Sequence, residues 1–269
     1  MLSNQPLSIG GILDGGFTLF RQGFAKILPA AAIAALPYSL TMSFLNARTA
    51  GLETETDPAI IEQTLLEFAV LFPLMFLSLV LMVGIILHRQ VAVARAEPIS
   101  LLKDVLVALK RAVPMIVLML LYMVLVMLGS VALLIPGIIL TVSMSLFFYV
   151  PYFEERGSWG ALWRSHALVW GGNWWRTASV LTLVSVILFA VSFVFYIGIG
   201  IVAAISVASG SSALTTTADF ILNWVVLVLV MPMYSWMALV LYNDLVLRKE
   251  GADLDEQLAE LQPGISSAG

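Results

Sequence analysis

An uninterrupted stretch of the chain, residues 112–153, contains no Asp, Glu, Lys or Arg. A helix rises about 1.5 Å per residue, so that roughly 20 apolar residues cross the hydrocarbon core of a bilayer. The stretch is therefore too long for one crossing and suits two. We expect the chain to reverse at Pro136-Gly137, because proline does not continue a helix and glycine adopts the left-handed backbone of a tight turn.

The rest of the sequence is also strongly hydrophobic and poor in charged residues. Hydrophobic residues make up 61% of the chain and charged residues 11%, and the mean hydropathy is +1.00. A soluble domain carries about 25% charged residues, so a water-soluble fold is excluded. Apolar runs near or above the crossing length lie at residues 27–46, 66–87, 112–134, 137–153, 178–208 and 220–245. We therefore predict an all-α, polytopic membrane protein with six transmembrane helices.

A single membrane domain is predicted for residues 1–249, followed by an acidic, partly disordered cytoplasmic tail at residues 250–269. Basic residues set the orientation, because Lys and Arg are retained on the cytoplasmic side of a membrane. With the N-terminus inside, Arg48 is the one of the 13 basic residues that lies outside. An odd number of crossings breaks this asymmetry, so both termini are predicted to be cytoplasmic.

Each pair of crossings is preceded by a short amphipathic segment, at residues 9–24, 102–113 and 158–173. In the first, Ile12 and Phe20 fall on one helical face, while Asp14 and Arg21 fall on the other. Helices with an apolar face and a basic polar face lie in the headgroup region of a bilayer. We therefore predict three cytoplasmic interfacial helices and, with them, a threefold internal repeat of interfacial helix, crossing, turn and crossing.

Tryptophan is concentrated in the third of these segments. Its side chains form one stripe, made of Trp159, Trp163, Trp170 and Trp174. Tryptophan is enriched where a membrane meets water, since its ring is apolar and its N–H is polar. An aromatic belt that fixes the depth of the helix explains the stripe, and a specific lipid or ligand contact is the alternative.

The residues that catalysis would need are scarce. Cysteine is absent, and the two histidines, His88 and His166, lie near membrane ends without zinc-ligand spacing. The sequence holds no GxSxG, HExxH or Walker motif and no basic arm for nucleic acid. The crossings lack ionisable side chains away from their ends, which argues against a proton-coupled transporter or an ion channel. We expect no enzyme activity, no cofactor, no metal and no nucleic-acid partner.

Three stretches of the chain, at residues 7–24, 136–176 and 241–254, carry a resemblance. They include Leu7-Ser8-Ile9-Gly10, Leu13-Asp14, Glu154-Glu155-Arg156-Gly157, Ala161-Leu162-Trp163-Arg164-Ser165 and Leu241-Tyr242-Asn243-Asp244-Leu245. In order and placement they resemble a prokaryotic integral membrane family related to the glycerophosphoryl diester phosphodiesterase membrane domain and to YciC-like proteins. The phosphodiesterase activity in that name belongs to a separate soluble domain, so the resemblance implies a membrane fold and no such activity.

Charged residues within this resemblance fall at the predicted cytoplasmic interface. They are Asp14, Arg21, Glu155, Arg164, Arg176, Asp244 and Arg248. Charges gain from pairing where the dielectric is low. We expect ion pairs and caps that hold the interfacial helices to the bundle, and the alternative is a site for phospholipid headgroups or a partner protein.

These observations favour a non-enzymatic integral membrane protein of the bacterial inner membrane. Its role would lie in envelope or lipid homeostasis or in scaffolding, with the bilayer, phospholipid headgroups or another membrane protein as partner. The alternative is a transporter or flippase for a lipid or other amphiphile. That alternative requires a hydrophilic cavity lined by groups such as Tyr122, Ser143, Ser145, Ser185 and Asn223.

Overall fold

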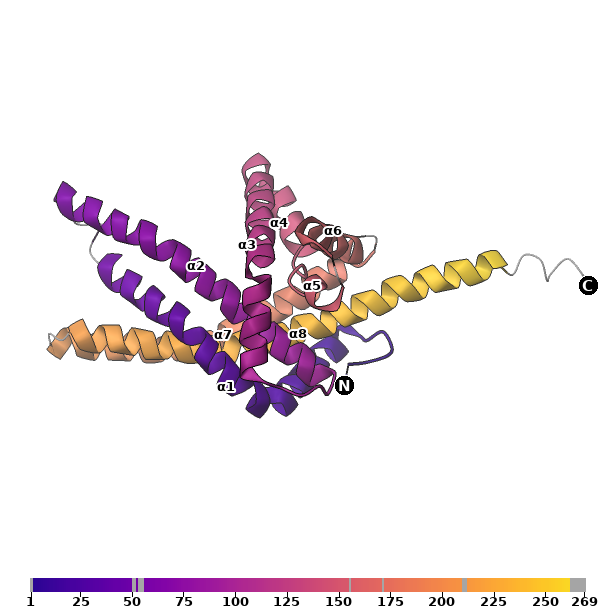
Figure 1. Ribbon diagram of the computed structural model, residues 1–269, viewed down its shortest axis with the longest axis horizontal. Helices are drawn as coiled ribbons and strands as arrows, with labels where there is room; N and C mark the ends of the chain where they lie inside the picture. The colour runs from indigo at the N-terminus through magenta and orange to yellow at the C-terminus, as the bar shows by residue number, and fades with distance from the viewer. Residues whose placement is uncertain are drawn as a thin grey trace, which may run out of the picture. The chain divides into compact units, whose positions relative to one another are not determined.

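The structure is a computed structural model that describes residues 2–49, 52, 56–154, 156–170, 172–209 and 212–261. All regular elements in these ranges are helices (Figure 1). In chain order they are α1 (Ile9–Thr49), α2 (Pro58–Ala94), α3 (Leu101–Ala132), α4 (Leu134–Ser143), α5 (Val150–Phe153), α6 (Ser158–Val169), α7 (Trp174–Ser209) and α8 (Ser212–Leu261). The prediction of an all-α protein is confirmed.

Within the described residues, α1, α2, α3, α7 and α8 are each long and apolar enough to cross a membrane. Many of their large apolar side chains are exposed, including Val70 at 73% and Val113 at 70%. Exposed apolar surface on this scale is what a bilayer covers. The chain is thus a multi-pass membrane protein by its helices, while the count of six crossings stays a prediction.

The predicted fourth crossing, residues 137–153, is not one continuous helix. Helix α4 ends at Ser143, consecutive turns follow, and α5 adds only four residues. The break is stabilised by Ser165 of α6, whose buried hydroxyl donates to the Ser143 carbonyl at 3.1 Å and accepts the Leu146 N–H at 3.2 Å. In a continuing helix these two groups would bond to other backbone groups, so Ser165 replaces the missing helical hydrogen bonds.

The reversal between α3 and α4 lies at Leu133, not at Pro136-Gly137 as expected. Leu133 has an extended backbone, with φ −163° and ψ 141°. Pro136 lies inside the first turn of α4, where a helix needs no N–H from proline. Gly137 serves close packing: a Cβ there would lie 2.8 Å from the Cα of Ser130 in α3. The two helices accordingly lie side by side (Figure 1).

Only one of the three predicted interfacial helices is a separate helix. Residues 9–24 and 102–113 continue without a break into the crossings of α1 and α3. Pro29 and Pro114 lie inside those helices. Membrane helices tolerate proline because neighbouring groups form hydrogen bonds with the backbone carbonyls that proline leaves without a partner. Helix α6 is separate because Gly172, with φ +110°, lies between it and α7. The threefold repeat stays a prediction.

The end of the last helix also differs from expectation. Helix α8 runs far beyond the predicted crossing at residues 220–245 and includes residues 250–261, the first part of the predicted tail. The remainder of the tail, residues 262–269, lies outside the described residues. Helix α2 begins after Asp57, whose carboxylate accepts the Ala59 N–H at 2.9 Å, so an acidic N-cap fixes that end.

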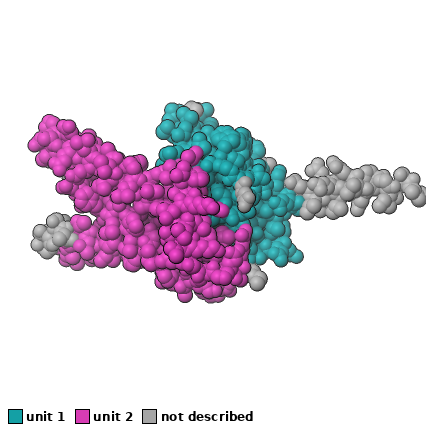
Figure 2. Space-filling model, in the orientation of Figure 1, with its two compact units in different colours: residues 1–19, 118–184, 236–269 teal, residues 20–117, 185–235 magenta. Residues whose placement is uncertain are grey.

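The chain forms two compact units that are interleaved in sequence (Figure 2). Unit 1 contains residues 1–19, 118–184 and 236–269, and unit 2 contains residues 20–117 and 185–235. Each has its own buried core, around Trp236 and Phe147 in unit 1 and around Met82 and Ile86 in unit 2. The division runs through α1, α3, α7 and α8, each of which contributes residues to both units.

We predict that Gly137→Ala destabilises the protein by about 1–3 kcal/mol, because the new methyl group overlaps the backbone of Ser130. Gly198→Ala is the matched control, since a Cβ at Gly198 meets nothing within 4 Å. It should be neutral or slightly stabilising, because alanine favours a helix by about 0.5–1 kcal/mol over glycine. Thermal unfolding in detergent micelles measures both, and equal effects would contradict the close α3–α4 packing.

Candidate functional site

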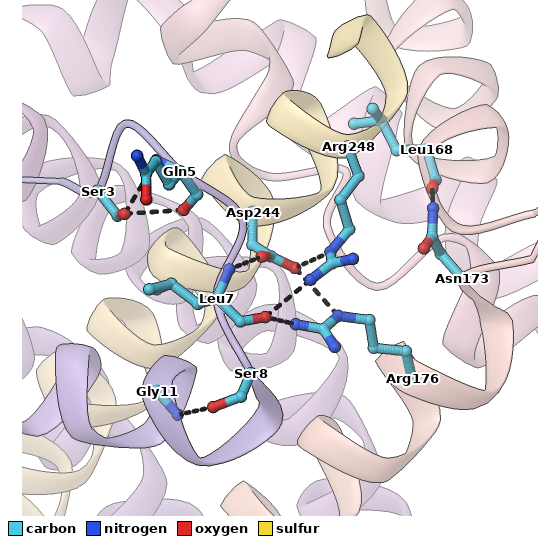
Figure 3. A network of polar contacts seen from close by, with 10 residues as sticks. All are labelled: Ser3, Gln5, Leu7, Ser8, Gly11, Leu168, Asn173, Arg176, Asp244 and Arg248. Carbon is cyan, nitrogen blue, oxygen red and sulfur yellow. Dashed lines mark hydrogen bonds and ion pairs between the residues drawn. The ribbon is translucent and has the colours of Figure 1, made fainter. Parts of the chain in front are cut away.

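A buried carboxylate, Asp244 of α8, is the centre of a polar cluster in unit 1 (Figure 3). Asp244 is only 1% exposed. Its Oδ1 accepts the backbone N–H of Leu7 at 2.6 Å, and its Oδ2 accepts Nε of Arg176 and Nε of Arg248, each at 3.0 Å. A buried charge is costly unless it is paired and hydrogen-bonded, and here both oxygens have partners.

The same two arginines bind the backbone of the segment that precedes α1. Arg176 and Arg248 each donate an Nη2 hydrogen bond to the Leu7 carbonyl, the latter at 2.8 Å. Asn243, which directly precedes Asp244 in α8, donates from Nδ2 to the Ser3 carbonyl at 2.9 Å. The segment has no strand or helix partner, so side chains of α7 and α8 satisfy its backbone groups. We call residues 3–8 the N-terminal strap.

Local sequence explains why these side chains meet. Asp244 and Arg248 lie four residues apart in α8 and therefore on one helical face. Arg176 lies in the first turn of α7. The strap is held beside them because α1 packs closely on α8: a Cβ at Gly16 would lie 3.0 Å from the Cα of Met237. Glycine in α1 thus permits the approach that brings Leu7 to Asp244.

A second cluster in unit 1 centres on Glu154, between α5 and α6. Its carboxylate accepts Nε of Arg156 at 2.6 Å, Nε of Arg164 at 2.7 Å and the hydroxyl of Tyr242 at 3.0 Å. Arg164 also pairs with Glu250 at 3.2 Å. Burial by itself raises the pKa of Glu154, but the hydrogen bonds from Arg164 and Tyr242 outweigh it, and the pKa lies below its ordinary value. Glu154 therefore stays charged and ties α6 to α8.

A third cluster lies in unit 2 and was missed by the sequence analysis. Asp104, 1% exposed, accepts Nε of Arg89 at 2.5 Å and is 2.6 Å from Nδ1 of His88. Arg89 also donates to the Lys26 carbonyl at 3.0 Å. The one sequence feature that could have indicated this cluster is the position of Asp104, an acidic residue in the first turn of α3, shortly after His88-Arg89 in the chain. Nothing in the pattern showed that the pair and the acid would face each other.

The structure brings together some of the seven predicted residues and not others. Arg176, Asp244 and Arg248 form one cluster. Arg164 pairs with Glu154, while Glu155 lies outside the described residues. Asp14 and Arg21 are exposed, and neither forms a hydrogen bond or ion pair among the described residues. The paired members join segments of the chain, in the manner of structural ion pairs.

The tryptophan stripe does not lie on one helix, because α6 ends at Val169. Trp159, Trp163 and Trp170 are each about half exposed, and the His166 ring lies between the rings of Trp163 and Trp170. Trp174 belongs to α7 and donates from its indole Nε1 to the Ile139 carbonyl at 3.4 Å. Exposed rings on a short helix fit the interpretation as an aromatic belt. The ring of Trp174, in contrast, is held by its hydrogen bond to the Ile139 carbonyl.

Several of the polar groups expected to line a transport cavity have local partners. The Tyr122 ring packs on Phe147, with centroids 4.7 Å apart. Ser145 donates to the Val142 carbonyl, and Asn223 donates to both the carbonyl and the carboxylate of Asp219. Ser143 is buried and Ser185 is exposed. Tyr122, Ser143 and Ser145 belong to unit 1, and Ser185 and Asn223 belong to unit 2.

No three His, Asp or Glu side chains lie close enough to hold a metal ion in the part of the chain that the structure describes. The chain matches no protein-family model, no curated protein and no solved structure.

We predict that acid weakens the attachment of α6. Because the pKa of Glu154 is lowered in the folded protein, its stabilising effect is present above its ordinary pKa of about 4.5 and is lost as the pH falls through the lower folded value. Glu154→Gln should lower the unfolding temperature at pH 7 and make no difference once the wild-type carboxylate is protonated. Thermal unfolding in micelles between pH 7 and pH 3 tests this. A constant difference at all pH values would contradict it.

Proposed function

We propose that this chain is a non-enzymatic integral membrane protein of the bacterial inner membrane, acting in envelope or lipid homeostasis or as a scaffold for a partner. The observation that carries the proposal is the set of partners of Asp244. They are two arginines and the backbone of the N-terminal strap. This buried acid is thus used to join three segments, and its oxygens are occupied by the protein.

The proposed orientation has both termini in the cytoplasm. The clusters of Asp244, Glu154 and Asp104 all use residues that the positive-inside rule assigns to the cytoplasmic side. Arg48, the one basic residue assigned to the outside, is half exposed and pairs with Glu67 at 2.9 Å. This orientation keeps each buried charge cluster out of the hydrocarbon, where charge is costly.

The family relationship is also a proposal. The three stretches that carry the resemblance contribute Leu7, Arg176, and Asp244 with Arg248, respectively, and these residues meet in one cluster. Their meeting gives the separated stretches a common physical role, which supports the resemblance. The role is attachment of the strap to α7 and α8.

Cysteine accessibility tests the orientation, and the native chain contains no cysteine that would interfere. Thr54→Cys and Ser212→Cys should react with a membrane-impermeant maleimide in intact cells. Ser100→Cys and Ser158→Cys should react only after permeabilisation. Labelling of position 158 in intact cells would overturn the proposed orientation.

Hydrolysis assays test the non-enzymatic role. Purified protein in liposomes of phosphatidylethanolamine and phosphatidylglycerol should release no more product from these lipids, or from added glycerophosphocholine, than protein-free liposomes do. Turnover that Asp244→Ala abolishes while Arg156→Ala retains it would show that the acid is catalytic, and the proposal would fail.

A further inference from the structure

The hairpin formed by α3 and α4 has one leg that is too short to cross a bilayer. Helix α4 contains 10 residues and is therefore about 15 Å long, whereas the hydrocarbon core is about 30 Å thick. The helix does not continue after Ser143, because turns follow and Ser165 binds the backbone groups at the break. The helical part of the return leg thus covers about half of the hydrocarbon thickness.

Helix α4 is also held beside the charged end of unit 1. The indole Nε1 of Trp174 donates to the Ile139 carbonyl at 3.4 Å. Arg176, two residues further along α7, pairs with Asp244 at 3.0 Å. The reversal at Leu133 lies six residues before Ile139, which corresponds to about 9 Å of helix rise. The reversal is therefore much closer to this charged cluster than the opposite surface of a bilayer would be.

The reversal is apolar where a turn in water would be polar. Turns in water are dominated by Gly, Pro, Asn, Asp and Ser, whereas residues 131–135 read Val-Ala-Leu-Leu-Ile. Four large side chains are mostly exposed, namely Val131 at 80%, Leu133 at 69%, Leu134 at 70% and Ile135 at 70%. The Leu133 N–H donates to the Gly129 carbonyl at 3.1 Å, and Pro136 has no N–H. Both features reduce the number of free backbone donors, as hydrocarbon requires.

The charges that flank the hairpin place its two ends on the same side of the membrane. Arg111 directly precedes the uncharged stretch, and Arg156 is the first basic residue after it. The positive-inside rule assigns both to the cytoplasm. A single crossing by α3, which is long enough for one, would place Arg156 outside and break the rule. Two crossings by the hairpin are excluded by the length of α4.

We propose that the α3–α4 hairpin is re-entrant: it enters the bilayer from the cytoplasmic side, turns at Leu133 within the hydrocarbon and returns to the same side. The acyl chains of the cytoplasmic leaflet cover its apolar tip. Helices α1, α2, α7 and α8 then make four crossings, an even number that keeps both termini in the cytoplasm. This inference rests on the proposed orientation and replaces the prediction that residues 112–134 and 137–153 each cross.

Single-cysteine variants measure the depth of the hairpin, because the native chain contains no cysteine. Leu133→Cys places a probe at the tip, Ile138→Cys on α4 and Trp159→Cys on α6, and each of these side chains is at least half exposed. Val194→Cys, near the middle of α7 and 68% exposed, is the matched reference for a position deep in the bilayer.

Each variant of the full chain is labelled with a nitroxide in vesicles of phosphatidylethanolamine and phosphatidylglycerol. Electron paramagnetic resonance then compares collisions with oxygen, which concentrates in hydrocarbon, and with a nickel chelate, which stays in water. Depth should increase from Trp159 through Ile138 to Leu133. Position 133 should lie about 7 Å deeper than position 138, from the rise of five helical residues, and should prefer oxygen as strongly as Val194 does.

A hairpin that crosses would reverse the order of depth between positions 138 and 133 and expose position 133 to the nickel chelate. In cells, Leu133→Cys should not react with an impermeant maleimide either before or after permeabilisation. Reaction in intact cells would show a crossing, and reaction only after permeabilisation would show a hairpin in the cytosol, so either result overturns the proposal. Size-exclusion profiles identify any variant that fails to fold.

The orientation is decided separately by Ser158→Cys. If position 158 reacts only after permeabilisation while position 133 reacts in intact cells, the re-entrant hairpin fails and the proposed orientation remains. If position 158 itself reacts in intact cells, the orientation fails and the re-entrant hairpin fails with it.

Discussion

The rest of unit 1 depends on the need of a buried carboxylate for partners. Asp244 lies in an apolar helix, where an unpaired charge would be strongly unfavourable. Its partners come from α7, from α8 and from the backbone of the strap. Separation of these segments would leave the buried carboxylate without hydrogen-bond partners. Because these partners are far apart in sequence, one carboxylate fixes contacts that helix propensity alone would not specify.

The need of buried polar groups for hydrogen-bond partners also determines other contacts between helices. Ser165 of α6 supplies the hydrogen bonds that α4 lacks where it ends, and so determines where the apolar stretch stops being helical. In unit 2, Asp104 holds Arg89, which also binds the Lys26 carbonyl. Apolar side chains give little directional information in a membrane, since lipid is as apolar as they are. Buried polar groups therefore specify which segments meet.

The sequence predicted the apolar centres of the long helices because hydropathy reports which segments a bilayer accepts. It was less successful at their ends: the helix break at Leu133 depends on the fit of Gly137 against Ser130, and the break after Ser143 depends on Ser165 from another helix. The sequence pointed to Arg176, Asp244 and Arg248, which meet in one cluster in the structure, since charges beside apolar runs are conspicuous. The role of Leu7 was not predictable, because it binds through its backbone. Asp104 was missed because a pattern of charges does not show which of them become buried.

Hydrogen–deuterium exchange at the N-terminal strap tests the central claim most directly. In wild-type protein in micelles, the amide of Leu7 should exchange slowly, because Asp244 accepts its N–H. In Asp244→Ala the peptide that contains residues 2–8 should exchange much faster, and in the control Arg156→Ala it should exchange as in wild type. Fast exchange of that peptide in the wild-type protein, at the rate seen in Asp244→Ala, would contradict the account.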